Sequence, residues 1–151
     1  MIETKPAFEA HVDLGETVVV GKSAGGLRRM VPIVGGTFEG PRVRGKVLAS
    51  GADFQLFRSD GVLEVEARYA IETHDKVAIM VVNRGIFRAP PEVSARMRRG
   101  ESVAPSEYYF RTCAQFEAPL GSAHEWLNGS LFLSRVEPEP RVVHVHFYEI
   151  V

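Results

Sequence analysis

The sequence predicts an all-β protein, a single-domain antiparallel β-barrel with one short helix. Three observations favour this fold class. Most segments alternate between apolar and polar residues with a period of two. Glycine, proline and other turn-forming residues interrupt this alternation about every 8–12 residues, as in antiparallel sandwiches and barrels. The chain has 151 residues, of which 45% are hydrophobic, and this is enough for one core of ordinary size.

The alternation is clearest where two adjacent strands are expected. Residues 62–73 place apolar side chains on one face and charged side chains on the other. Residues 77–84 are apolar on both faces until Asn83, so a second layer, a lid or a neighbouring subunit must cover them. Closure of such strands into a barrel removes free edges, and about eight strands leave room for a small ligand. The predicted strands are 6–13, 17–20, 31–38, 43–49, 53–58, 62–73, 77–84, 106–117, 126–135 and 142–150, with turns at 23–26, 35–40, 50–53, 59–61, 74–76 and 137–140.

One segment, "APPEVSARMRRGES", departs from the strand pattern. Its two prolines suit the first turn of a helix, Val93 and Met97 stand four residues apart, and Gly100 suits the C-terminal end. We therefore predict a helix over 91–99, within a long connection between two strands. Such connections often act as lids. The helix either covers one open end of the barrel, with its arginines attracting an anion, or packs on the outer wall.

The motifs "VPIVGGTFEGPRVRGKVLASGADFQLFRSDGVLEVEARYAIETHD", "VNRG", "YYFRTCAQFE" and "WLN" closely resemble the DUF3237 family, also called UPF0311. The resemblance extends from about Asp13 to the C-terminus. It implies a small β-barrel domain, which we class as calycin-like, and it implies no settled activity or catalytic residues. Phe54 stands where tryptophan is usual after "GAD", and Ala118 stands where threonine usually follows "FE".

The segment "SEYYFRTCAQFE" places Arg111 on one strand face with Tyr109 and Glu117. A guanidinium among aromatic rings suits a planar anion, because it offers two parallel donors to a carboxylate or enolate. We therefore expect Arg111 to stabilise an oxyanion, with Tyr109 and Glu117 as ligand contacts. The alternative is an ordinary ion pair between Arg111 and a glutamate of a neighbouring strand.

Two further segments offer carboxylates. Asp53 in "GADF" is either a general base at the barrel mouth or a turn residue bonded to its own backbone. Glu66 and Arg68 in "EVEARY" share a strand face, and an arginine beside a carboxylate keeps it ionised. Glu66 is therefore the second candidate base, with Arg68 as a ligand contact. The alternative is a charge pair that faces solvent.

Three more polar or aromatic residues are candidates for ligand contacts. Trp126 offers an apolar platform with one donor, and Asn128, on the same strand face, offers a donor and an acceptor. Asn83 in "NRG" is the third. Core packing for Trp126 and Asn128, and a turn for Asn83, are the alternatives.

Charge and motifs exclude several kinds of function. A net charge of −1 gives no overall attraction to nucleic acid or an anionic membrane. No apolar run reaches the ~18 residues of a membrane span, and the N-terminal segment lacks the apolar core of a signal peptide. Cys113 is the only cysteine, which excludes an internal disulfide and fits a reducing cytoplasm. His144 and His146 share a strand face but lack a third ligand at a matching spacing, so we expect no metal.

The sequence therefore predicts a cytoplasmic protein that needs no cofactor and takes a small, mostly apolar, anionic molecule into a barrel. The first hypothesis is a lyase or isomerase that moves a proton next to a carbonyl. The second is a binding or carrier protein with the same pocket. The third is a homo-oligomeric structural subunit whose polar faces meet another copy.

Overall fold

The computed structural model describes residues 1–151 and consists mainly of β-strands. One α-helix, α1 (Pro91–Arg98), and two short 3₁₀-helices, η1 (Pro105–Glu107) and η2 (Glu125–Gly129), lie in the connections. The ten strands are β1 (Thr4–Leu14), β2 (Val18–Ser23), β3 (Gly26–Glu39), β4 (Arg44–Val47), β5 (Ala52–Phe57), β6 (Leu63–Thr73), β7 (Ala78–Arg88), β8 (Tyr109–Glu117), β9 (Phe132–Pro138) and β10 (Val142–Ile150).

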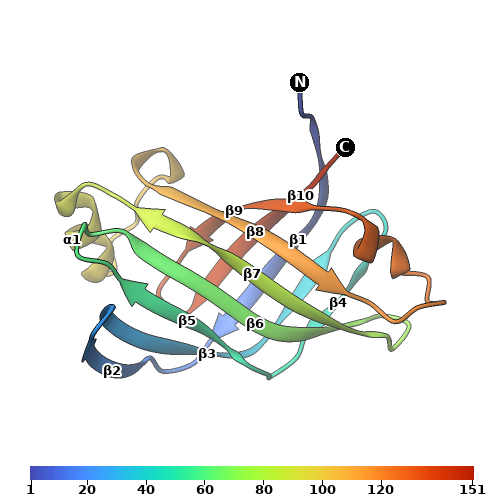
Figure 1. The fold of residues 1–151 in the computed structure, drawn as a ribbon, viewed down its shortest axis with the longest axis horizontal. Helices are drawn as coiled ribbons and strands as arrows, with labels where there is room; N and C mark the ends of the chain where they lie inside the picture. Colours follow the sequence, from blue (N-terminus) through green and yellow to red (C-terminus); the bar gives the residue numbers. More distant parts are fainter.

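The strands form one antiparallel sheet that closes on itself (Figure 1). Neighbours follow the order β1, β10, β9, β8, β7, β6, and then β4 and β5, which both lie between β6 and β3. Pairing of β3 with β1 completes the circle. Because β4 and β5 together act as one interrupted strand and β2 extends outward from β3, the closed wall is an eight-stranded barrel. The prediction of an antiparallel β-barrel is confirmed.

The two ends of the barrel differ (Figure 1). At one end lie α1, the turn between β2 and β3, and the turn between β5 and β6. At the other end lie η2, the turn between β6 and β7, and the loop that enters β4. No helix of the structure is both long and apolar enough to cross a membrane.

The helix predicted at 91–99 is confirmed as α1, in the connection between β7 and β8. Proline occupies its first turn, as expected for a residue without an N–H to pair. Val93 is its only buried residue. The Arg96 guanidinium donates a hydrogen bond of 2.9 Å to Glu107 Oε1 in η1, so a single buried side chain and one ion pair link this helix to its surroundings.

Several predicted boundaries were wrong: β3 begins at Gly26 instead of residue 31, and β8 begins at Tyr109 because residues 105–107 form η1. The turn predicted at 35–40 lies inside β3, where Gly36 has a φ of 136° and a Cβ there would stand 2.0 Å from the His11 carbonyl oxygen of β1. Glycine thus permits close contact between two strands rather than a reversal of the chain. The strand predicted at 126–135 begins only at Phe132, because residues 125–129 form η2.

Because successive side chains of a strand point to opposite faces, every second side chain points into the barrel interior. Near η2 this interior is filled by an aromatic cluster, namely Phe8, Phe116, Phe132 and Phe147, whose ring centroids lie 4.6–5.4 Å apart. All four side chains are at least nine-tenths buried. Edge-to-face and stacked contacts of this kind add to the stability that their burial supplies.

Candidate active site inside the barrel

An interior polar cluster, namely Arg29, Asp53 and Gln55, lies on β3 and β5. Gln55 pairs with Val65 and Asp53 with Ala67 of β6, so both share the inward face with buried Val65. The Gln55 side-chain amide donates a hydrogen bond of 2.7 Å to Asp53 Oδ2. Arg29 Nε in turn donates one of 2.5 Å to Gln55 Oε1. Three polar side chains are thus connected within an otherwise apolar barrel.

The surroundings of Asp53 change its acidity. Burial raises the pKa of the Asp53 carboxyl, although hydrogen bonds from the Gln55 side chain and the Glu66 backbone N–H oppose this shift. Burial also lowers the pKa of the Arg29 guanidinium, and the nearby Asp53 charge partly restores it. Tyr69, which is buried on β6, has a raised pKa because of burial and then because of the Asp53 charge. The carboxyl of Asp53 is therefore a stronger base than an ordinary aspartate.

Three other inward side chains carry buried polar atoms without a partner in the protein. They are Asn83 Oδ1 on β7, Thr112 Oγ1 on β8 and Ser134 Oγ on β9. These residues lie on three consecutive strands, and Thr112 and Ser134 are direct cross-strand neighbours. Buried polar atoms are nearly always hydrogen-bonded to protein or to ordered water, so these three grouped atoms are available to a molecule from outside the chain, either water or a ligand.

Solvent reaches part of this interior. Ala67 faces inward between Val65 and Tyr69, which are both buried, yet Ala67 itself is only half-buried, and so is Asp53. At the end of the barrel near the β5–β6 turn, Leu27 pairs with Phe57 and remains 41% exposed. The guanidinium of Arg29 lies 4.7 Å from the centre of the Phe57 ring. Solvent therefore contacts part of the inward surface near Asp53, and the exposed Leu27 follows the β2–β3 turn, at the end of the barrel where α1 also lies (Figure 1).

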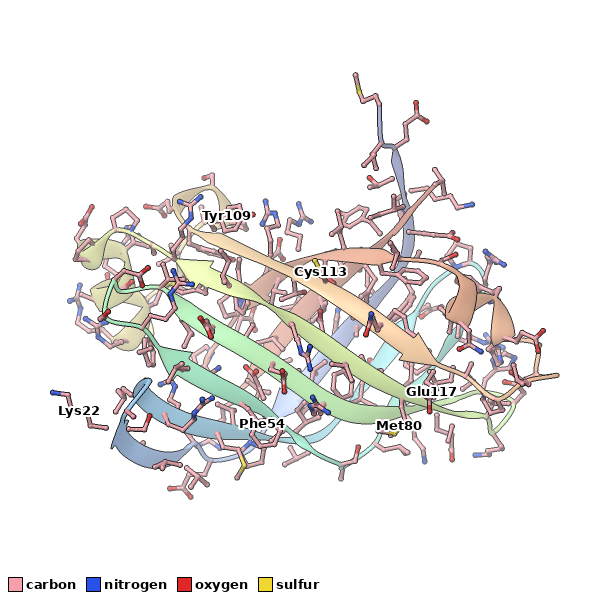
Figure 2. The ribbon with its side chains drawn as sticks, in the orientation of Figure 1. Lys22, Phe54, Met80, Tyr109, Cys113 and Glu117 are labelled. Carbon is pink, nitrogen blue, oxygen red and sulfur yellow. The ribbon has the colours of Figure 1, made fainter.

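The Arg111 side of β8 faces solvent rather than the interior. Burial alternates strictly along β8, with Phe110, Thr112, Ala114 and Phe116 inward. Figure 2 shows Tyr109, Cys113 and Glu117 following one another along the outer side of the strand. Arg111 Nη1 donates to its own neighbour, the Phe110 carbonyl oxygen, at 3.0 Å and stands 5.3 Å from the Tyr109 ring. The expectation that this face lines a cavity is therefore corrected, because the inward face is the one with Thr112.

Glu66 and Arg68 also lie on the outer wall. Arg68 Nε donates a hydrogen bond of 2.9 Å to Glu66 Oε2, and the Arg84 guanidinium lies 2.6 Å from Oε1. The hydrogen bond from Arg68 lowers the pKa of Glu66. This arrangement corresponds to the alternative of a solvent-facing charge pair, and it separates Glu66 from Asp53, whose side chain points inward.

Trp126 and Asn128 lie in η2, at the opposite end of the barrel from α1 (Figure 1). The Arg42 guanidinium stacks 3.6 Å from the centre of the Trp126 ring. Asn128 accepts a hydrogen bond from the Ala118 N–H and donates one to the Ala118 carbonyl oxygen. Both residues therefore stabilise the loop that follows β8. Trp126 also packs against the core, 6.1 Å from the Phe132 ring, which corresponds to the predicted alternative of core packing. Of the predicted site residues carried by strands, only Asp53 and Asn83 face the barrel interior.

The histidines of β10 line a shallow outer hollow of about 200 Å³. His146 Nδ1 lies 3.1 Å from Glu9 and its Nε2 lies 3.4 Å from Glu137, while His144 Nε2 lies 3.4 Å from Glu139. Each imidazole thus faces glutamates. No three His, Cys, Asp or Glu side chains form a group that could hold a metal ion.

Four interior residues were not predicted from the sequence: Arg29, Gln55, Thr112 and Ser134. Thr112 and Ser134 had a usable signal, because each is the single polar residue in an apolar inward series: Phe110, Thr112, Ala114, Phe116 on β8 and Phe132, Ser134, Val136 on β9. Arg29 had no such signal. It lies in the polar sequence "GLRRM" before residue 31, which was not predicted as a strand although it forms the first part of β3.

Comparison with known proteins agrees with this fold. The family model described as "Protein of unknown function (DUF3237)" matches residues 2–150. The UPF0311 protein RPA1785 of Rhodopseudomonas palustris is 39% identical over 132 residues, which cover 87% of this chain and 86% of that protein. Its crystal structure superposes with a TM-score of 0.95, covering 100% of this chain and 99% of that one at 35% identity.

Two other solved structures are similar. A "beta-barrel like protein" from Acinetobacter baumannii gives a TM-score of 0.86 at 31% identity, covering 100% of this chain and 97% of that one. A protein described as "an enzyme from Penicillium herquei" gives 0.74 at 17% identity, covering 99% and 95%, and at this identity the likeness concerns the fold alone. From the family match and the identity to RPA1785, the chain belongs to the DUF3237 (UPF0311) family.

Proposed function

We propose that the protein takes a small, mostly apolar, anionic carbonyl compound into the barrel and that Asp53 moves a proton on it, as a lyase or isomerase without a cofactor. The observation that carries this proposal is the inward carboxyl of Asp53, with its raised pKa, beside the half-buried guanidinium of Arg29. A carboxyl whose pKa approaches the working pH is effective in proton transfer. The guanidinium supplies the charge that attracts an anion.

The chemistry needs one base and one acceptor of electrons. The Asp53 carboxylate takes the proton from the carbon beside the carbonyl, and the electron pair of that C–H bond forms a C=C bond. The electrons of the C=O double bond move to the oxygen, which becomes an enolate. In a β,γ-unsaturated substrate, return of the same proton to the γ carbon shifts the double bond and re-forms the C=O bond, which completes an isomerisation. In a substrate with a leaving group on the β carbon, re-formation of the C=O bond expels that group with its electron pair, which completes an elimination. Arg29 lies close enough to the carboxyl for both groups to contact one small molecule.

The Penicillium herquei protein supports the proposal only by analogy. Its description as an enzyme indicates that a barrel of this shape can house catalysis. The residues that would act in the present chain are argued from its own interior alone.

The test is proton exchange in deuterium oxide. The wild-type protein is mixed with a panel of aromatic 2-oxo acids, and the loss of the signals of the protons beside the carbonyl is followed by NMR. We expect exchange above the buffer rate for at least one compound. Asp53→Asn should reduce it by about 100-fold or more, since a general base contributes roughly that much, and Glu66→Gln, which alters an outer carboxylate, should not.

The same measurement separates enzyme from carrier. Binding of a panel member by wild-type protein, without any exchange above the buffer rate, would support a carrier with the same interior. Exchange that persists in Asp53→Asn would overturn the role of Asp53.

We also propose that the protein self-associates through β2. This strand pairs only with β3, and its Val18, Val19 and Val20 are exposed to 46%, 64% and 69%. A free antiparallel edge can pair with the same edge of a second copy, as in a two-fold dimer. Light scattering after chromatography should give a dimer mass for wild type and a monomer mass for Val19→Lys.

The unpaired, exposed Cys113 supports a cytoplasmic location.

A further inference from the structure

We infer that Thr112 and Ser134 form the subsite that receives the carbonyl oxygen of the ligand, with Asn83 beside them. The inference rests on the proposed function and deepens it, because it assigns donors to the oxygen that becomes an enolate. The two hydroxyl groups, called here the hydroxyl pair, occupy adjacent strands of the barrel interior.

The first argument is the absence of protein partners for groups that are almost fully buried. Thr112 is 4% exposed and Ser134 is 2% exposed, and neither hydroxyl oxygen has a hydrogen-bond partner in the chain. Leaving a buried hydroxyl unpaired destabilises a folded protein. Two such groups side by side therefore lower the stability of the folded protein, and core packing alone does not explain why they are present.

The second argument is that the two hydroxyls do not satisfy each other. Threonine and serine directly opposite one another on antiparallel strands commonly form a hydrogen bond. Thr112 and Ser134 are direct partners in the register of β8 and β9, yet both oxygens stay unpaired. Each hydroxyl hydrogen is thus free to point to a third atom between them.

The third argument concerns the fit around Thr112. Its other cross-strand neighbour is Gly85, and a Cβ added to Gly85 would stand only 2.6 Å from the Thr112 Cγ2 methyl group. The methyl group therefore occupies the side facing β7. The same Cβ would stand 2.0 Å from the Arg111 carbonyl oxygen, so glycine permits the close approach of the β7 and β8 backbones, and a larger residue would move the segment that carries Thr112.

Asn83 adds a polar group to the same inner surface. It pairs with Ala114, the next inward residue after Thr112 on β8, and its Oδ1 is buried without a partner. A ligand oxygen contacted by the two hydroxyl donors in this apolar barrel would have its developing negative charge stabilised strongly, as in an oxyanion hole, and the Asn83 Oδ1 beside them could accept a hydrogen bond from a ligand hydroxyl. The substrate class that follows is a carbonyl compound, which enters from the α1 end with its oxygen directed to this pair.

The first experiment measures stability and needs no ligand. Thr112→Val and Ser134→Ala remove one hydroxyl each at nearly constant volume, and Thr37→Val makes the same change at an exposed position of β3. If the hydroxyls are unpaired until a ligand arrives, the melting temperature of both interior variants should equal that of wild type or exceed it by about 1–3 °C. A fall beyond that of Thr37→Val would show structural hydroxyls and would overturn the inference.

The second experiment compares ligands that differ by one oxygen. Phenylpyruvate and 3-phenylpropionate differ in the carbonyl oxygen, as do indole-3-pyruvate and indole-3-propionate. Calorimetry should show the wild type binding the oxo acid about tenfold more tightly, the value expected for about 1.4 kcal/mol. Thr112→Val and Ser134→Ala should lower this ratio towards one, while the affinity for the deoxo acid stays constant.

The outcomes separate this inference from the proposed function. An oxo preference that is unchanged in both variants would overturn the hydroxyl pair and leave the anion site with Asp53 standing. Wild-type protein that binds neither member of either pair would overturn the proposed function and the subsite together. An oxo preference lost in the interior variants but kept in Thr37→Val would support both.

Discussion

The side-chain amide of Gln55 donates a 2.7 Å hydrogen bond to the Asp53 carboxylate and accepts one of 2.5 Å from the Arg29 guanidinium. The amide therefore links the two charged side chains and takes the place of a direct contact between them. Without Gln55 the guanidinium and the carboxylate could form a direct ion pair, which would hold the carboxylate ionised and lower its basicity. The Gln55 amide opposes part of the rise that burial causes in the pKa of Asp53, and it leaves the Arg29 charge available to a ligand.

The raised pKa of Asp53 predicts a specific dependence of stability on pH. Because the folded state binds this proton more tightly than the unfolded state, the stability that Asp53 contributes is complete below about pH 3.9 and is lost as pH rises through the raised pKa. Thermal unfolding from pH 3.5 to 8 should therefore show the melting temperature of Asp53→Asn rising relative to wild type as pH increases.

Asp60 provides a control of opposite sign. Hydrogen bonds from Arg58 and from the Val62 backbone lower its pKa to about 2. Its stabilising effect is present above the unfolded value and is lost as pH falls toward 2. Asp60→Asn should lose stability at neutral pH and approach wild type in acid. If Asp53→Asn followed this same trend, Asp53 would be an ion-paired aspartate and the proposed base would be excluded.

Anion binding should depend on Arg29 and not on Arg111. The first guanidinium is half-buried beside Asp53, and the second is exposed on the outer face of β8. Arg29→Ala should weaken binding of 3-phenylpropionate about tenfold or more, since removing a charged hydrogen bond costs about 1.5–3 kcal/mol, and Arg111→Ala should change it less than twofold. Calorimetry of both variants checks this, and a larger loss in Arg111→Ala would move the anion site to the outer wall.

Helix α1 should open more readily than the strands. Val93 is its only buried residue, and the partly buried Arg96–Glu107 ion pair contributes little because solvent still screens it. Val93→Ala should speed amide exchange over residues 91–98 about tenfold, from the loss of about 1.5 kcal/mol of burial, and leave the strands unchanged. An oxo acid that binds should slow this exchange if the helix covers the mouth, and equal exchange with and without it would make α1 a fixed part of the wall.

The aromatic cluster should dominate global stability. Phe116 contacts Phe8, Phe132 and Phe147 with its ring, so its truncation removes several contacts and leaves a cavity. Phe116→Ala should lower the free energy of unfolding by about 3–5 kcal/mol. Phe54→Ala, at a residue 38% exposed on the outer wall, should change it by less than about 1 kcal/mol. Urea titrations of the two variants measure the difference.

Much of the fold follows from the sequence because strand alternation is a local property. Residues 62–73 alternate in sequence and in burial, and the prolines and Gly100 mark the limits of α1. Gly36 was misread because its role depends on the distance to β1, which no local pattern encodes. The segment 126–135 was misread because Trp126 and Leu127 pack on the core from a 3₁₀-helix, and such packing can resemble a strand over a few residues.

The site was harder to predict than the fold. Alternation correctly grouped Tyr109 with Arg111 and Thr112 with Phe116, but it could not say which group faces inward, since both contain large side chains. By side-chain chemistry alone, arginine, tyrosine and glutamate are the more reactive group, which favoured the wrong face. The informative feature was a single threonine within an apolar series, because a buried polar residue departs from the ordinary composition of a core.

Trp126 is the only tryptophan of the chain, and the Arg42 guanidinium lies directly against its ring. Tryptophan emission, excited at a wavelength that tyrosine does not absorb, therefore reports on the η2 end of the barrel. A molecule that enters beside α1 would leave the emission spectrum unchanged, whereas unfolding would separate the indole from the cation and alter it. Fluorescence is thus a selective optical measure of global unfolding in this protein, and ligand entry requires a second reporter, such as a tryptophan introduced at Phe57 in the opposite end.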